Sequence, residues 1–159
     1  MQSTIDPLTI DNAAFWLRLG AAILCGGAIG IERQLRGKAA GIRTSILICL
    51  GTMLYVALGA SFGSRSDPTR ALGQVITGIG FLGAGVILVN EGRILGITSA
   101  AVIWVLAALG ATIGVGRVAT ALVLTLTVLA ILIGVEAMEA VWKRLRADRT
   151  GLDKLHIDL

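Results

Sequence analysis

Residues 94–116 read ILGITSAAVIWVLAALGATIGVG, which is 23 consecutive residues without a charged side chain. A helix needs about 20 apolar residues to cross the hydrocarbon core of a bilayer. Three further uncharged stretches have this length, at residues 44–64, 71–90 and 118–135. A shorter stretch, residues 19–31, reaches spanning length when residues 14–17 join it and Arg18 extends to the interface. The sequence therefore predicts five membrane-spanning helices.

The composition of the 159 residues supports the same fold class. Charged residues make up 15%, well below the roughly 25% of soluble domains, and the mean hydropathy is +0.85. These values exclude a soluble globular domain, a disordered chain and a nucleic-acid-binding module. We expect an all-α integral membrane protein, a bundle of five transmembrane helices within residues 14–141. The expected spans are about 14–32, 44–64, 71–90, 96–114 and 118–141, between an extracytoplasmic segment 1–13 and a short cytoplasmic tail 142–159.

The distribution of basic residues predicts the orientation. Ten Lys and Arg follow the first, third and fifth spans, whereas four lie on the other side, namely Arg18, Arg65, Arg70 and Arg117. Cytoplasmic loops carry the excess of Lys and Arg, so the N-terminus is expected outside and the C-terminus in the cytoplasm. The first 13 residues have no basic residue, so we interpret the first span as retained, not as a signal peptide. The predicted location is the bacterial inner (plasma) membrane.

The 21 glycines indicate how the helices pack. In lipid, small residues spaced four apart allow close backbone contact. Such pairs are Gly26 and Gly30, Gly59 and Gly63, and Gly110 and Gly114; the third span has the stripe Gly73, Thr77, Gly80 and Ala84. We expect the first four spans to pack tightly with the third at the centre, and the fifth to face lipid. The number of stripes also predicts a homodimer. Candidate packing or pathway residues are Gln74, Gly78, Gly80, Gly83, Gly85, Thr98 and Ser99.

The residues offer no catalytic set. Residues 78–83 match GxGxxG, but a dinucleotide site needs a preceding strand, so helix packing or a locally opened helix is favoured. Cys25 and Cys49 fall inside spans and are expected as buried free thiols. The only histidine, His156, lies in the tail and cannot form a triad or metal site with them. We therefore expect no enzyme.

Polar residues gather at the predicted cytoplasmic ends of the first two spans. Glu32 and Arg36 are one helical turn apart, with the acid in the favourable N-terminal position. A paired stop to the helix is one interpretation. The other is a functional cluster at the edge of the hydrocarbon, where a charge is costly. Its candidate members are Glu32, Arg33, Gln34, Arg43 and Thr44.

Two acids at the inner end of the fifth span are the remaining candidates. Glu136 and Glu139 are expected to form interfacial salt bridges, and with Glu32 they are weak candidates for a cation site. No cofactor is expected. Binding of Mg²⁺ stays an open alternative. Mg²⁺ prefers oxygen ligands, and the sequence shows no clear set of them.

Several stretches together form a recognisable pattern. They are residues 26–34 (GGAIGIERQ), 40–44 (AGIRT), 67–70 (DPTR), 74–85 (QVITGIGFLGAG) and 96–101 (GITSAA), followed by Trp104. In this order the chain resembles the MgtC/SapB family of bacterial inner-membrane proteins. The resemblance implies a role in adaptation to low magnesium, virulence in pathogens and restraint of ATP synthase. Longer members carry a cytoplasmic ACT-like domain, so the chain resembles either a short form or a shortened piece of a longer member. Many members have histidine where this chain has Ser45.

Two functions from different classes remain. The first is a non-enzymatic regulator that acts through another membrane protein, either ATP synthase or a magnesium transporter by resemblance. The alternative is a small transporter or channel for Mg²⁺ or another cation. Missing acids in mid-membrane favour the regulator, whereas the glycine density of the third span supports the alternative.

Overall fold

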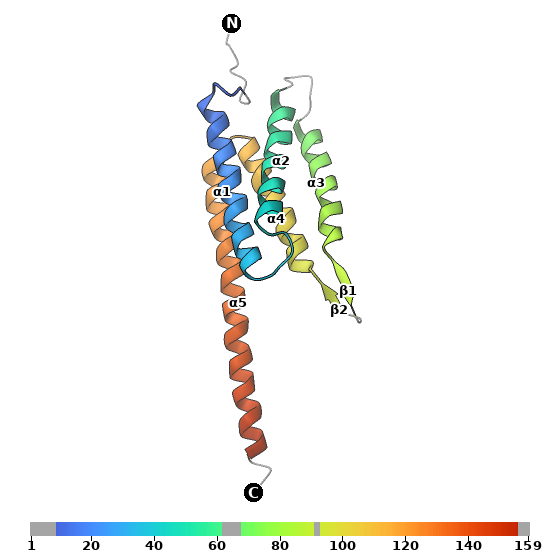
Figure 1. The fold of residues 1–159 in the computed structure, drawn as a ribbon, viewed down its shortest axis with the longest axis vertical. Coiled ribbons are helices and arrows are strands. Elements are labelled where there is room, and N and C mark those ends of the chain that lie inside the picture. Colours follow the sequence, from blue (N-terminus) through green and yellow to red (C-terminus); the bar gives the residue numbers. More distant parts are fainter. Residues whose placement is uncertain (1–8, 62–67, 91–92, 156–159) are drawn as a thin grey trace. The chain divides into compact units, whose positions relative to one another are not determined.

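The part of the chain that the structure describes forms five helices and one small β hairpin (Figure 1). The computed structural model describes residues 9–61, 68–90 and 93–155. The helices are α1 (Ala13–Leu35), α2 (Ile42–Ser61), α3 (Pro68–Gly85), α4 (Ile97–Gly114) and α5 (Val118–Leu155). Strands β1 (Leu88–Asn90) and β2 (Arg93–Leu95) pair antiparallel between α3 and α4.

The helices confirm the predicted fold class of an integral membrane protein. Among the described residues, four stretches are long and apolar enough to cross a membrane: Ala13–Leu35, Ile42–Ala60, Ile97–Gly114 and Val118–Met138. The apolar part of α3, Leu72–Gly85, is shorter. The chain divides into two compact units, Met1–Thr125 and Leu126–Leu159. The first contains α1 to α4, the hairpin and the start of α5, and the second continues α5.

Helix α2 is the centre of the first unit. A Cβ atom at Gly26 of α1 would lie 2.8 Å from the Cα of Ile46, and one at Gly30 would lie 2.7 Å from the Cα of Ile42. On the other side of α2, a Cβ at Gly114 of α4 would lie 2.8 Å from the carbonyl oxygen of Met53. Only glycine permits such backbone contact. The predicted close packing through the glycine pairs of the first and fourth spans is confirmed.

The space where α1, α2 and α4 meet is filled by apolar side chains. Fully buried members are Cys25, Ile29, Cys49, Met53, Ile103, Leu106, Leu109 and Ile113. Both cysteines are free thiols, as the sequence predicts. On α5, Ala121 and Thr125 are buried, while residues 122–124 between them are exposed. The first unit therefore has a close-packed apolar interior that ends at one face of α5.

The prediction that the third span lies at the centre is wrong. Of the α3 side chains that the structure describes, only Ile79 and Gly83 are buried. Added Cβ atoms at Gly73, Gly78, Gly80 and Gly85 would meet nothing within 4 Å. Two faces of α2 already carry the glycine contacts of α1 and α4, so α3 packs at the edge. A stripe of small residues shows which face of a helix another helix can approach closely. It does not show which helix, if any, packs there.

The third predicted span also differs from the structure at its end. The sequence predicts a span to Asn90, whereas helix α3 ends at Gly85 and Leu88–Asn90 is a strand. Val86, Ile87 and Val89 are β-branched and favour extended backbone. Gly96 has φ of +88°, and a Cβ there would collide with the carbonyl oxygen of Val86. The hairpin can therefore turn into α4 only through a glycine.

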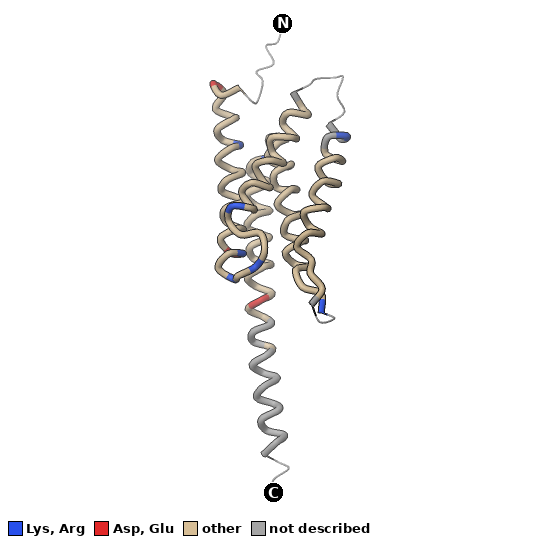
Figure 2. The backbone as a smooth tube through the Cα atoms, turned by 45° about the vertical axis from the view of Figure 1, so that its right-hand side comes forward, with Lys and Arg blue, Asp and Glu red and all other residues tan. Residues whose placement is uncertain are grey.

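Charged residues of the first unit lie at or near the helix ends, and the middle of the bundle is uncharged (Figure 2). Arg18 of α1 donates a hydrogen bond from Nη1 to the carbonyl oxygen of Gly114, at 3.2 Å. This carbonyl belongs to the last turn of α4, where the helix dipole favours a cation. Arg18 thus joins α1 to α4 at the end of the bundle opposite Glu32.

Candidate functional site

Glu32, Arg33 and Arg36 form a closed ionic cluster in the last turn of α1. Arg33 donates to Glu32 from Nε at 2.5 Å and from Nη2 at 2.6 Å. Arg36 Nε forms an ion pair with Glu32 Oε1 at 2.7 Å, which confirms the predicted contact one turn apart. Glu32 and Arg33 are buried, with 7% and 3% of their surfaces exposed. A buried carboxylate is tolerated because two guanidinium groups neutralise it and occupy both oxygens.

The loop between α1 and α2 is held in one conformation by side chains from both helices. Gln34 accepts a hydrogen bond on Oε1 from the backbone N–H of Ile42, at 3.3 Å. Ser45 donates its hydroxyl to the carbonyl oxygen of Ala40, at 2.8 Å, and is fully buried. Ala40 has φ of +61°, a left-handed conformation that costs an L-residue about 1–2 kcal/mol. The two hydrogen bonds join this strained loop to the end of α1 and the start of α2.

The other two predicted members of the cluster lie apart from it. Arg43 and Thr44 begin α2 and are exposed, whereas Glu32 and Arg33 are buried. Neither Arg43 nor Thr44 contributes to the ion pairs of Glu32. The structure therefore divides the predicted set into three groups. Glu32 and Arg33 belong to the ionic cluster, Gln34 holds the α1–α2 loop, and Arg43 and Thr44 are exposed. Arg36 and Ser45 belong to the site although they were not among the candidates; the spacing of Glu32 and Arg36 was the available signal.

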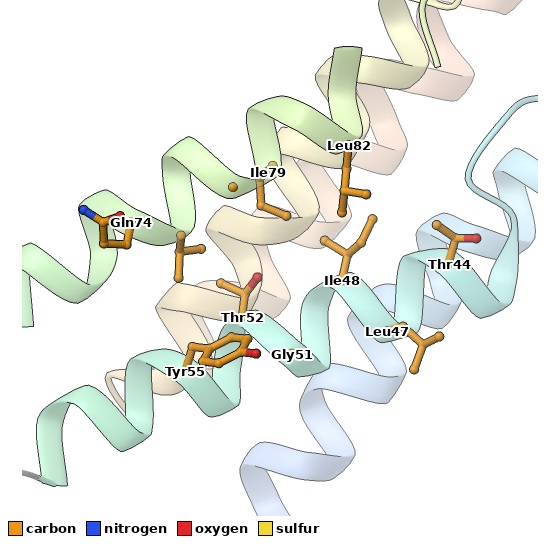
Figure 3. A pocket seen from close by; sticks show the side chains of 11 residues that line it. Thr44, Leu47, Ile48, Gly51, Thr52, Tyr55, Gln74, Ile79 and Leu82 are labelled. Atoms are coloured by element: carbon orange, nitrogen blue, oxygen red, sulfur yellow. The ribbon is translucent and has the colours of Figure 1, made fainter. Parts of the chain in front are cut away.

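Thr44 faces a groove between α2 and α3 (Figure 3). The groove has a volume of about 660 Å³. Its polar side chains are Thr44, Thr52, Tyr55 and Gln74, and the rest of its wall is apolar. In Figure 3, Ile79 and Leu82 point from α3 toward α2, with Gln74 at one end of the groove and Thr44 near the other. The predicted pathway residues Gln74 and Gly78 therefore line an open, mostly apolar groove.

The remaining packing or pathway candidates lie elsewhere. Gly80 and Gly85 are exposed and do not line the groove, while Gly83 packs against Ala100 of α4. At the start of α4, Thr98 is exposed and Ser99 is buried. The GxGxxG stretch lies entirely within α3, without the preceding strand of a dinucleotide site.

The three candidate cation ligands fall in different parts of the chain. Among the residues it describes, no group of three or more His, Cys, Asp or Glu side chains could hold a metal ion. Glu136 lies in the second unit, whereas Glu32 lies in the first. The side chain of Glu139, like His156, is outside the described residues. A cation site at Glu32, Glu136 and Glu139 stays a prediction.

The fold and the site define a multi-pass helical membrane protein with an ionic cluster at one end of its helices. The MgtC family model matches residues 19–141, and the chain belongs to this family.

Named relatives agree with this assignment. The chain is 46% identical over 114 residues to the "Putative magnesium transporter YhiD" of Escherichia coli (strain K12), which covers 66% of this chain and 53% of that protein. It is 40% identical over 113 residues to the MgtC proteins of Brucella abortus (strain 2308) and Salmonella typhimurium (strain 14028s / SGSC 2262). Those matches cover 71% of this chain and 48% of the Brucella protein. The chain thus spans about half the length of these relatives. No solved structure gives a significant match.

Proposed function

We propose that the chain is a non-enzymatic regulatory protein of the bacterial inner membrane that acts by binding another membrane protein. The observation that carries the proposal is the closed ionic cluster of Glu32, Arg33 and Arg36, next to the α1–α2 loop that hydrogen bonds hold in place. Its charges are fixed in place by mutual hydrogen bonds, so it has a defined shape before any partner binds. Because Glu32 and Arg33 are buried, the cluster supports the exposed loop beside it, and a preorganised surface loses little conformational entropy on association.

The same end of the bundle presents a net positive charge. Residues 32–43 contain one acid, Glu32, and four basic residues: Arg33, Arg36, Lys38 and Arg43. The formal net charge of this stretch is therefore +3. Lys38 and Arg43 are exposed. Complementary charge raises the association rate and selects partners, so this surface suits an acidic region of a second protein.

The packing of the interior also supports a binding role. Backbone contacts at Gly26, Gly30 and Gly114 bring α1 and α4 directly against α2, and apolar side chains fill the space among them. An ion would lose its hydration in such an interior without gaining oxygen ligands.

The biological setting is proposed from the family. We place the protein in adaptation to low magnesium or to stress inside host cells, with a role in virulence where the organism is a pathogen. Its proposed partner is ATP synthase or a magnesium transporter, and its proposed state is a homodimer with the ionic cluster on the cytoplasmic side.

The alternative function is a small transporter of Mg²⁺ or another cation. The groove between α2 and α3 favours it, because the hydroxyl groups of Thr44, Thr52 and Tyr55 on α2 and the amide group of Gln74 on α3 line it. Mg²⁺ binds oxygen ligands and usually keeps several waters, for which an open groove has room. The name of the Escherichia coli relative, "Putative magnesium transporter YhiD", is in line with this alternative.

Growth of cells in low magnesium tests the regulator. Arg43→Ala removes an exposed cation, so we expect normal amounts of folded protein but loss of growth support. Glu32→Gln also lowers stability, so its growth is divided by the amount of folded protein in the membrane, and we expect growth support to be lost on that scale too. Arg117→Ala is the matched control, because Arg117 is an exposed arginine outside this cluster. Full growth with Arg43→Ala and Glu32→Gln at normal abundance would reduce the cluster to a helix boundary.

Flux into liposomes separates the two functions. Purified protein is reconstituted around a magnesium-sensitive dye, and entry of Mg²⁺ is compared with that in protein-free vesicles. The regulator predicts no protein-dependent flux together with capture of a membrane partner that weakens with Arg43→Ala. Saturable flux that Gln74→Ala abolishes would establish the transporter instead.

A further inference from the structure

The apolar part of α3 is too short to cross a bilayer as a helix. Leu72–Gly85 contains 14 residues, which at about 1.5 Å per residue is roughly 21 Å, against about 30 Å of hydrocarbon. Neighbouring α4 has 18 residues and is long enough. Gly83 of α3 packs against Ala100, near the start of α4, so the two helices reach the same end of the bundle at similar depth. The hairpin begins where α3 stops.

Polarity changes along this hairpin from its base to its tip. Cross-strand partners are Leu88 with Leu95, Val89 with Ile94, and Asn90 with Arg93. Successive side chains of a strand point to opposite faces, so the first two pairs cover both faces of the base with apolar groups. The four apolar side chains are 51–74% exposed. The polar pair lies farthest from the helices.

We propose that the base of the β1–β2 hairpin lies in lipid at the boundary between acyl chains and headgroups. It thereby completes the membrane crossing that α3 begins. Leu88 and Val89, at about 3.3 Å per extended residue, add roughly 7 Å, which together with the roughly 21 Å of α3 approaches the hydrocarbon thickness of about 30 Å. Asn90 and Arg93 then reach the headgroups.

Lipid is the occupant because the apolar groups lie on both faces of the base. A docking protein covers one face of a two-stranded ribbon, and water would leave both faces unfavourably hydrated. The surface is also continuous with α3 and with α4, a membrane-spanning helix. Strands of three residues leave few unpaired backbone groups, and at the boundary those groups reach headgroups and water. Glu91 and Arg93 cancel in charge, so anionic lipid is not required.

Nitroxide labels on the full chain test the proposal in phosphatidylcholine nanodiscs. Single cysteines replace Val89, Ile94, Arg93 and, as a loop control, Lys38. Cys25 and Cys49 are 0% exposed, so the unsubstituted chain should give little background labelling. Collision rates with oxygen, which concentrates in lipid, are divided by those with a water-soluble nickel complex. We expect ratios above one at positions 89 and 94, and below one at positions 93 and 38.

Two other outcomes would overturn the lipid assignment. Ratios at 89 and 94 equal to that at 38 would place the hairpin in water. Low collision rates with both reagents would mean that protein covers it, either a second copy or a partner. Adding the anionic lipid phosphatidylglycerol to the nanodiscs should leave the ratios at 89 and 94 unchanged. If these ratios exceeded one only in anionic nanodiscs, charge and not apolar contact would anchor the hairpin. Circular dichroism of each labelled chain confirms that the helices are intact, so that each ratio reports on the folded protein.

Discussion

Arg33 donates two hydrogen bonds to the carboxylate of Glu32, the residue directly before it in α1. Adjacent residues of a helix usually point in different directions, and this pair forms in the last turn of α1. With Arg36 on Oε1, both oxygens of Glu32 have cationic partners. A divalent cation would have to displace two arginines to bind this carboxylate, which favours an organising role for Glu32 over metal binding.

The first prediction concerns the stability of this cluster. Glu32→Gln leaves Arg33 buried without a countercharge, so the free energy of unfolding should fall by about 3 to 5 kcal/mol. Unfolding in mild detergent with increasing dodecyl sulfate, followed by circular dichroism, measures the change. The double variant Glu32→Gln with Arg33→Met should recover part of the loss, because it also removes the buried cation. A double variant that is less stable than the single one would mean that Arg33 has other essential partners.

A second prediction compares two glycines. A Cβ at Gly110 would collide with the carbonyl oxygen of Cys49 and lie 2.8 Å from the Cβ of Thr52. Gly110→Ala should therefore destabilise the fold by about 1–3 kcal/mol through overpacking. Gly80 has open space around it, and Gly80→Ala should change stability by less than about 1 kcal/mol. The same detergent titration compares them, and equal losses for both would place α3 in the packed core after all.

The third prediction concerns the strained loop. Ala40→Gly should raise stability or leave it unchanged, because glycine adopts the left-handed conformation of residue 40 without a steric penalty. Ser45→Ala should lower stability by about 1 kcal/mol, since the buried hydrogen bond to Ala40 is lost. Thermal unfolding of the two variants in one detergent gives both values. A large loss with Ala40→Gly would show that the methyl group of Ala40 makes a contact more important than the strain.

Orientation in the membrane gives a fourth prediction. Cysteines at Lys38 and Ser66 should react from opposite sides, since the positive-inside rule places residue 38 in the cytoplasm and residue 66 outside. A membrane-impermeant maleimide on intact cells should label position 66 only, and both positions after the cells are opened. Labelling of both in intact cells would contradict the arrangement with the N-terminus outside.

The fold class could be read from the sequence because its cause is local. A charge-free run such as residues 94–116 must satisfy its own backbone hydrogen bonds in lipid, and a helix does this within one segment. The glycine pairs of α1 and α4 were equally readable, since spacing by four places both glycines on one helix face. The contact of Glu32 with Arg36 followed from the same periodicity.

Only the tertiary structure decided which helix lies at the centre. The stripe at Gly73 and Gly80 promises close packing as clearly as Gly26 and Gly30 do, yet open space surrounds it because α1 and α4 already occupy α2. Tertiary structure also separated Arg43 and Thr44 from Glu32, by burying the carboxylate and leaving the start of α2 exposed. Helical periodicity specifies which residues share a face, whereas the partner of that face depends on competition among all helices for the same contacts.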